Sequence, residues 1–109
     1  MIFNKVKYDL IVTIVSKGYS EDVVKYAKKA GAEGSTILSG RGTGDHDAAK
    51  LFGILIEPEK EIILTVVSDA KTNEILETIC DKLKLDEPGN GIAFVLDITK
   101  CSGIHDTNK

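Results

Sequence analysis

Two segments of this chain are apolar at almost every position, and no other feature constrains the fold as strongly. In residues 7–16 and in residues 61–67, both sets of alternating positions are mostly apolar: Leu10, Val12 and Ile14 against Ile11, Thr13 and Val15, then Ile62, Leu64 and Val66 against Ile63 and Val67. Successive side chains of a strand point to opposite faces of a sheet. Each segment is therefore predicted to be a β-strand that must be covered on both faces.

Two other segments show the spacing of amphipathic helices. Residues 20–31 are predicted to form a helix with Ser20 as its N-cap and Gly31 just beyond its end. A second helix, capped by Asp69 or Thr72, is indicated by apolar residues that recur at the helical period: Ile75, Leu76, Ile79, Cys80 and Leu83.

Further strands are predicted at residues 35–39 and 92–98, and the second of these follows a strong turn signal at residues 86–91. Between the two apolar strands the pattern is weaker. There, residues 47–52 are predicted to form a short turn of helix and residues 54–56 a short strand.

The resulting order is β-α-β-β-α-β, which is typical of an α+β, ferredoxin-like fold with an antiparallel sheet and two helices on one face. Residues 1–109 are predicted to be one domain, with a loose tail at 102–109. Two helices cover only one face of such a sheet, so the other apolar face requires a partner. We therefore expect a homo-oligomer, and specifically a homotrimer.

Composition excludes several classes of protein. The chain is 42% hydrophobic and 28% charged, which is typical of a globular domain, and its net charge is −3 with Arg41 as the only arginine. Nucleic-acid binding requires a clustered basic face and is not expected. Neither a signal peptide nor a membrane-spanning segment is evident, so a cytoplasmic location is expected. The two cysteines, Cys80 and Cys101, have neither disulfide nor zinc-site spacing.

Three glycines alternate with other residues directly after the strand predicted at 35–39. Gly40, Gly42 and Gly44 leave the backbone free to adopt unusual conformations and let its amides approach a ligand closely. Such a loop can hold a phosphate or a carboxylate. A flexible hairpin connection is the alternative interpretation, and the glycines alone do not separate the two.

Four segments of the chain form a more specific set in their order and spacing: Gly31-Ala32-Glu33-Gly34-Ser35-Thr36, Arg41-Gly42-Thr43-Gly44, Pro58-Glu59-Lys60-Glu61 and Pro88-Gly89-Asn90-Gly91-Ile92-Ala93-Phe94-Val95. Together they resemble the PII signal-transduction (nitrogen regulatory protein P-II) family, and specifically its short-loop, PII-like branch. The resemblance covers essentially the whole chain. It implies a compact trimer with ligand sites in the clefts between subunits.

The resemblance also implies a function. Residues 41–60 would correspond to the T-loop, which contacts a target protein and changes shape with the ligand. Family members commonly sense adenine nucleotides, so AMP, ADP or ATP is the implied effector, and they regulate transporters, metabolic enzymes or transcription factors. The implied ligand-binding residues are Thr36, Arg41, Gly42, Thr43, Gly44, Lys60, Gly89, Asn90 and Gly91.

Several positions depart from the pattern of nucleotide-binding members. Asp45 stands where such members have arginine, Ile92 replaces a phosphate-binding lysine, and Gly103 and His105 replace two arginines. Charge-assisted contacts supply much of the affinity for a triphosphate. A ligand of low charge is therefore expected to bind at least as well as ATP.

Two other classes of function have some basis in the sequence. The run Asp45-His46-Asp47 has metal-ligating chemistry, and a CutA-type trimeric protein that binds divalent metals would share the fold. Consecutive residues seldom converge on one ion, so no metal site is predicted. An enzyme is the weakest alternative, because no nucleophile and base stand at a suggestive spacing. The chain is predicted not to be an enzyme.

Overall fold

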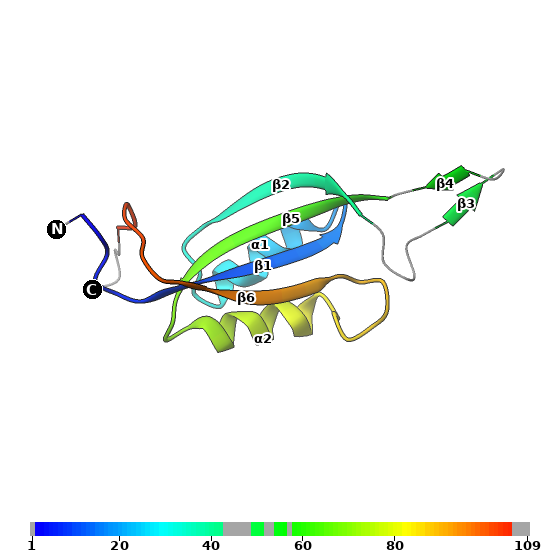
Figure 1. Ribbon diagram of the computed structural model, residues 1–109. Helices are drawn as coiled ribbons and strands as arrows, with labels where there is room; N and C mark the ends of the chain where they lie inside the picture. Colours follow the sequence, from blue (N-terminus) through cyan, green and yellow to red (C-terminus); the bar gives the residue numbers. More distant parts are fainter. Residues whose placement is uncertain (1, 43–48, 52–53, 57, 106–109) are drawn as a thin grey trace.

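The computed structural model describes residues 2–42, 49–51, 54–56 and 58–105 (Figure 1). Its elements, in chain order, are β1 (Tyr8–Ser16), α1 (Ser20–Lys29), β2 (Ser35–Arg41), β3 (Ala49–Leu51), β4 (Ile54–Ile56), β5 (Glu59–Ser68), α2 (Thr72–Lys82) and β6 (Ile92–Ile98). None of the helices in these ranges is long and apolar enough to cross a membrane.

Four strands form one sheet in the order β2-β5-β1-β6, and every neighbouring pair is antiparallel. Both helices pack on the same side of this sheet (Figure 1). The predicted ferredoxin-like arrangement is therefore confirmed. Strands β2 and β5 extend further than predicted because their ends pair with each other, with Arg41 opposite Glu59.

The core lies between the sheet and the helices, on what we call the helix face. It is built from alternate residues of the two central strands and from the inner side of each helix: Ile11, Val15, Ile63 and Val67 with Val23, Ala27, Ile75 and Ile79. All of these side chains are at most 3% exposed. The odd-numbered apolar set, which includes Ile11 and Ile63, is thus buried within one subunit.

The opposite side of the sheet, which we call the open face, has no helix on it. The register places the even-numbered residues of all four strands there. Several are large, apolar and exposed: Leu38, Val66, Ile92, Phe94 and Leu96. The even-numbered apolar set therefore lies on the side of the sheet that no helix covers, as the sequence predicted, and within it Val66 is exposed while Val12 is buried.

A carboxylate from the sheet stabilises the start of α1. The backbone N–H groups of Gly18 and Ser20 donate hydrogen bonds to Glu61 Oε1 at 2.8 and 3.2 Å. Ser20 was predicted to be the N-cap, and this prediction was wrong: the cap position is Tyr19, and its side chain makes no capping bond. A tertiary contact from β5 replaces the local cap, which the local sequence does not reveal.

The caps predicted for the second helix were also wrong. Lys71 takes the N-cap position and makes no side-chain capping bond. Thr72 is instead buried, and its hydroxyl donates to Asp9 Oδ2 at 2.7 Å, which ties the helix to β1. At the end of α1, by contrast, Gly31 has a φ of +119°, so its predicted role just past the helix is confirmed.

The helical turn predicted at residues 47–52 is corrected by the structure. Ala49–Leu51 is a strand, and it pairs antiparallel with the predicted strand Ile54–Ile56, with Lys50 opposite Leu55. A single turn of helix is costly to nucleate, whereas pairing two short segments satisfies their backbone groups mutually. Residues 43–48, 52–53 and 57 lie outside the described residues.

The described part of the tail is joined to the N-terminal segment. The Asn4 side chain donates to the carbonyl of Ile104 at 2.7 Å and accepts from its N–H at 3.3 Å. The backbone N–H of Asn4 donates to the carbonyl of Cys101 at 2.7 Å. Residues 106–109 lie outside the described residues, so a loose tail stays a prediction there.

The contact of Glu61 with the start of α1 predicts a pH-dependent contribution to stability. Hydrogen bonds from the backbone of Gly18, and then from Ser20, hold the pKa of Glu61 below its ordinary value. A lowered folded-state pKa gives stability that is fully present above the unfolded pKa of about 4.3 and is lost as pH falls through the folded pKa. Glu61→Gln is expected to destabilise the protein at neutral pH and to flatten stability between pH 5 and 3. If the free energy of unfolding of Glu61→Gln falls between pH 5 and 3 as steeply as that of the wild type, the prediction is contradicted.

Two buried threonines at neighbouring positions of the helix face offer a matched test of hydrogen bonding. The Thr65 hydroxyl lies 2.9 Å from Ser35 Oγ, whereas the Thr13 hydroxyl has no hydrogen-bond partner among the described residues. Thr13→Val is expected to raise the free energy of unfolding by about 1–2 kcal/mol, and Thr65→Val to lower it by about 1 kcal/mol. Urea denaturation measures both changes in the free energy of unfolding. Changes of the same sign would contradict the prediction that only Thr65 gains stability from its hydrogen bond.

Candidate ligand site at the glycine loops

The two predicted ligand-binding loops lie at the same end of the sheet. Strand β2 ends at Arg41, where the first glycine loop begins, and β6 begins at Ile92, directly after the second. The antiparallel register brings these ends level, because Ser16 pairs with Lys60, Lys60 with Gly40, and Ile92 with Ile14. The topology of the fold thus places both loops on one side of the molecule.

Within one subunit, however, the loops are on opposite edges. In the order β2-β5-β1-β6, the first loop belongs to one outer strand and the second to the other. Three strand spacings separate these edges, which is about 14 Å. A small ligand held by both loops therefore cannot be held by one subunit alone.

The second loop has a backbone that requires glycine. Gly89 has a φ of +84° and Gly91 a φ of +131°. A Cβ on Gly91 would lie 2.5 Å from the carbonyl oxygen of Ile14, so no side chain fits. Between the two glycines, the Asn90 amide donates to the carbonyl of Lys84 at 3.0 Å. The loop is thus pressed against the end of β1 and tied to the end of α2.

The first loop is described as far as Gly42. Its N–H donates to the carbonyl of Pro58 at 3.4 Å, and a Cβ added there would meet only Lys60 Cγ, at 4.0 Å. Register and alternation put Lys60 on the open face and Arg41 on the helix face. The two predicted cations are therefore on opposite sides of the sheet. Thr43 and Gly44, together with 45–47, lie outside the described residues.

Thr36 lies apart from both loops. It is exposed on the open face and pairs with Leu64, four residues before Gly40 on the same strand. Four residues of strand span about 13 Å. A ligand at Gly42 reaches Thr36 only if it extends along the β2 edge. Ile92, at the start of β6, is 56% exposed and presents an apolar side chain beside the second loop.

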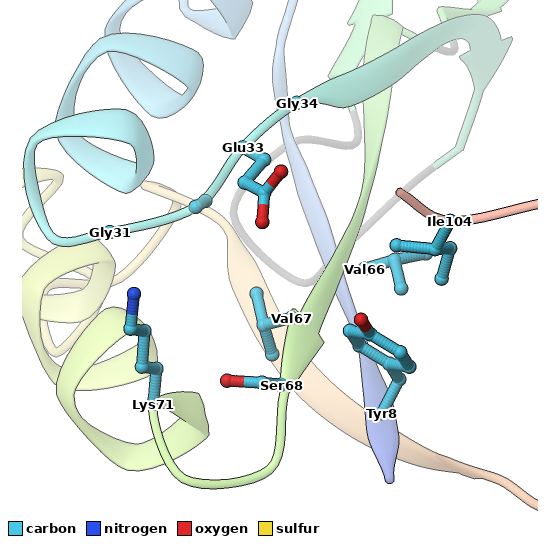
Figure 2. A pocket seen from close by; sticks show the side chains of 10 residues that line it. Tyr8, Gly31, Glu33, Gly34, Val66, Val67, Ser68, Lys71 and Ile104 are labelled. Atoms are coloured by element: carbon cyan, nitrogen blue, oxygen red, sulfur yellow. The ribbon is translucent and has the colours of Figure 1, made fainter. Parts of the chain in front are cut away.

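A cavity at the other end of the sheet was not predicted from the sequence. It has a volume of about 260 Å³ and is bordered by the loop after α1, the end of β5, Tyr8 and Ile104. Figure 2 shows the Glu33 carboxylate, the Lys71 ammonium group and the Ser68 and Tyr8 hydroxyls around it. The one related signal in the sequence is Gly31, which predicts that the chain turns into a loop after the first helix. The tail residue Ile104 closes one side through its bonds to Asn4.

Metal and nucleophile chemistry receive no support from the described residues. Within them, no group of three or more His, Cys, Asp and Glu side chains is placed to hold a metal ion. Both cysteines are free and partly buried, and burial, with the nearby charge of Glu77, raises the pKa of the Cys80 thiol. A raised pKa makes a thiol less reactive at neutral pH.

Known structures share this fold. The chain matches the structure of the B. subtilis GlnK-ATP complex with a TM-score of 0.66 and 24% sequence identity, and the match covers 85% of this chain and 83% of that one. It matches a second structure of B. subtilis GlnK with a TM-score of 0.63 and 22% sequence identity, and this match covers 85% of this chain and 86% of that one. It matches Arabidopsis thaliana PII bound to citrate with a TM-score of 0.64 and 24% sequence identity, and this match covers 85% of this chain and 78% of that one. No curated protein matches the sequence.

A family model identifies the chain more directly than these likenesses do. The model described as Nitrogen regulatory protein P-II matches residues 8–108, which is nearly the whole chain. Neither this match nor the described residues support the CutA-type alternative. The chain therefore belongs to the nitrogen regulatory protein P-II family, whose members are regulatory signal transducers and not enzymes.

Proposed function

We propose that this protein is a homotrimeric sensor of the cytoplasm that binds an adenine nucleotide or a small anion between subunits and regulates a partner protein through residues 41–60. The observation that carries the proposal is the position of the two glycine loops, level with each other but on opposite edges of the sheet. A ring of subunits sets the β6 edge of one sheet beside the β2 edge of the next. The two half-sites then form one cleft.

The open face supports the trimer. Its exposed apolar side chains come from three of the four strands, β2, β5 and β6, and so include both edges of the sheet. Exposed apolar area of this extent is unfavourable in water and marks an interaction surface. Three sheets that pack their open faces together bury it in a closed assembly, without leaving a surface for further growth.

The ligand class follows from the loops and from the neighbours. Backbone N–H groups at the loop of Gly89 and Gly91 can hold an anion without help from side chains. Gly42, whose own N–H already donates to the carbonyl of Pro58, lets a ligand approach the first loop closely. One structural neighbour carries ATP and another carries citrate, so the shared fold accommodates both a nucleotide and a small anion. In this chain Ile92 stands where the family resemblance implies a lysine, and this favours ligands of low charge.

The segment between β2 and β5 suits contact with a partner. The paired strands β3 and β4 extend beyond the end of the four-stranded sheet (Figure 1). The segment begins at Gly42, next to the proposed ligand, so occupancy of the cleft can bias its conformation. A membrane transporter or an enzyme of nitrogen or carbon metabolism is the partner class that we propose.

The trimer is tested by charging one face of the sheet at a time. Leu96 is 49% exposed on the open face, and Ile37 is 45% exposed on the helix face of an edge strand. Leu96→Lys is expected to dissociate the trimer, because burying an unpaired charge at an interface is costly. Ile37→Lys is the matched control and should remain trimeric. Sedimentation at micromolar concentration that finds a wild-type monomer would refute the proposal.

The ligand site is tested by side-by-side calorimetric titration of ATP, ADP, AMP and citrate. We expect AMP, ADP or citrate to bind at least as well as ATP, because each absent charge-assisted contact removes roughly 1.5–3 kcal/mol of affinity. Gly42→Val should abolish binding without disturbing the fold, since a Cβ there meets only Lys60 Cγ at 4.0 Å.

Ser39→Val provides the control for that substitution. Ser39 is an exposed residue of β2, the edge strand that leads to Gly42, and strand alternation directs its side chain to the helix face. It adds the same β-branched group without entering the proposed cleft, so binding should persist. If ATP binds more tightly than AMP, the expectation that the site favours ligands of low charge is wrong. If Gly42→Val leaves the affinity for every ligand unchanged, the site lies elsewhere.

A further inference from the structure

A second cavity lies in the helix layer, on the other side of the glycine loop that precedes β6. It has a volume of about 340 Å³, which is within the range of small-molecule sites. Three parts of the chain line it. The end of β1 and the first turn of α1 form one wall, the last turn of α2 forms another, and the loop 89–90 closes it: Ser16, Tyr19, Asp22, Lys82, Leu83, Lys84, Gly89 and Asn90.

Two lysines of this lining, Lys82 and Lys84, form no ion pair within the part of the chain that the structure describes. Among the described residues, no carboxylate lies within ion-pair distance of Lys82 or Lys84, although three other ion pairs are formed elsewhere. The Lys82 ammonium lies 5.9 Å from the centre of the Tyr26 ring. Asp22 of α1 also lines this cavity. The lining of the cavity thus includes two cationic side chains and one carboxylate.

The backbone at Lys84 adopts a conformation that lysine rarely takes. Its φ is +54°, and it is the only residue other than glycine with a positive φ in the described ranges. Lys84 is in the same position after α2 that Gly31 occupies after α1, where both N–H groups bond back into the last turn. Glycine adopts this conformation without strain, and lysine does not. Strained residues of this kind cluster at ligand sites.

We propose that this cavity binds a small phosphomonoester that also carries hydroxyl groups, of about the size of a sugar phosphate. Lys82 and Lys84 hold the phosphate, and Asp22 accepts hydrogen bonds from the hydroxyls. The carboxylate disfavours a simple dianion with no donor groups, because like charges repel. The site lies within one subunit, on the side of the helices, and is distinct from the inter-subunit cleft at Gly42.

Calorimetric titration with ribose 5-phosphate, inorganic phosphate and ribose tests the proposal on the intact chain. We expect ribose 5-phosphate to bind more tightly than inorganic phosphate and ribose not to bind. Lys84→Gln should weaken ribose 5-phosphate by about tenfold or more, since one charge-assisted contact is lost. Lys28→Gln removes a charge from an exposed position on α1 outside the cavity and should leave binding unchanged.

Two further variants separate binding from folding and from the cleft. Lys84→Gly removes the ammonium group and the backbone strain together, so this variant should be at least as stable as the wild type and still lose binding. Asp22→Asn should weaken ribose 5-phosphate relative to inorganic phosphate. Gly42→Val should leave ribose 5-phosphate binding intact, which distinguishes this cavity from the cleft.

Two results would overturn the proposal. The first is the absence of binding heat with millimolar ribose 5-phosphate, and the second is an affinity that Lys84→Gln and Lys84→Gly leave unchanged. In either case the two lysines serve only to neutralise the negative end of the α2 dipole.

Discussion

The structure depends on the antiparallel pairing of β1 with β5, two central strands that are apolar on both faces. Their odd-numbered residues, such as Ile11 and Ile63, are buried beneath the helices, and their even-numbered residues face the other way. A one-residue slip in this register would exchange the two sets. Because both sets are apolar, hydrophobicity alone does not decide which side the helices take. Polar ties such as Thr72 to Asp9 and Glu61 to the start of α1 are specific to the observed side.

Much of the fold could be predicted from the sequence, because it is encoded in local periodicity. The strand at residues 92–98 agrees to the residue, and the two faces of β1 are assigned correctly. The helix starts were mispredicted for a physical reason. Ser20 and Thr72 have the chemistry of local caps, but residues distant in the sequence, Glu61 and Asp9, make the bonds that are observed. Local propensity does not contain these tertiary contacts.

The candidate site could be predicted less fully than the fold. Glycine spacing located both loops, but it gave no indication that they lie on opposite edges of the sheet, since this follows from strand order. Strand alternation separates Arg41 from Lys60, which are close in space yet face different sides. The helix-layer cavity could not be predicted, because lysines such as Lys82 and Lys84 are common at the end of a helix. Only the backbone angle at Lys84 sets it apart.

The loop before β6 links the two sites that we propose. It leads into the edge strand β6, where the inter-subunit cleft would form, and the Asn90 amide donates to the carbonyl of Lys84 at the helix-layer cavity. A ligand that fixes Lys84 would therefore restrain the loop, and a ligand in the cleft would restrain it from the other side. If both sites are occupied as proposed, each ligand lowers the entropy that the other must lose on binding, and linkage requires the effect to be reciprocal. The backbone of Gly91 packs so closely against β1 that an added Cβ would lie 2.5 Å from the carbonyl oxygen of Ile14, so this short loop has little freedom to absorb the restraint elsewhere.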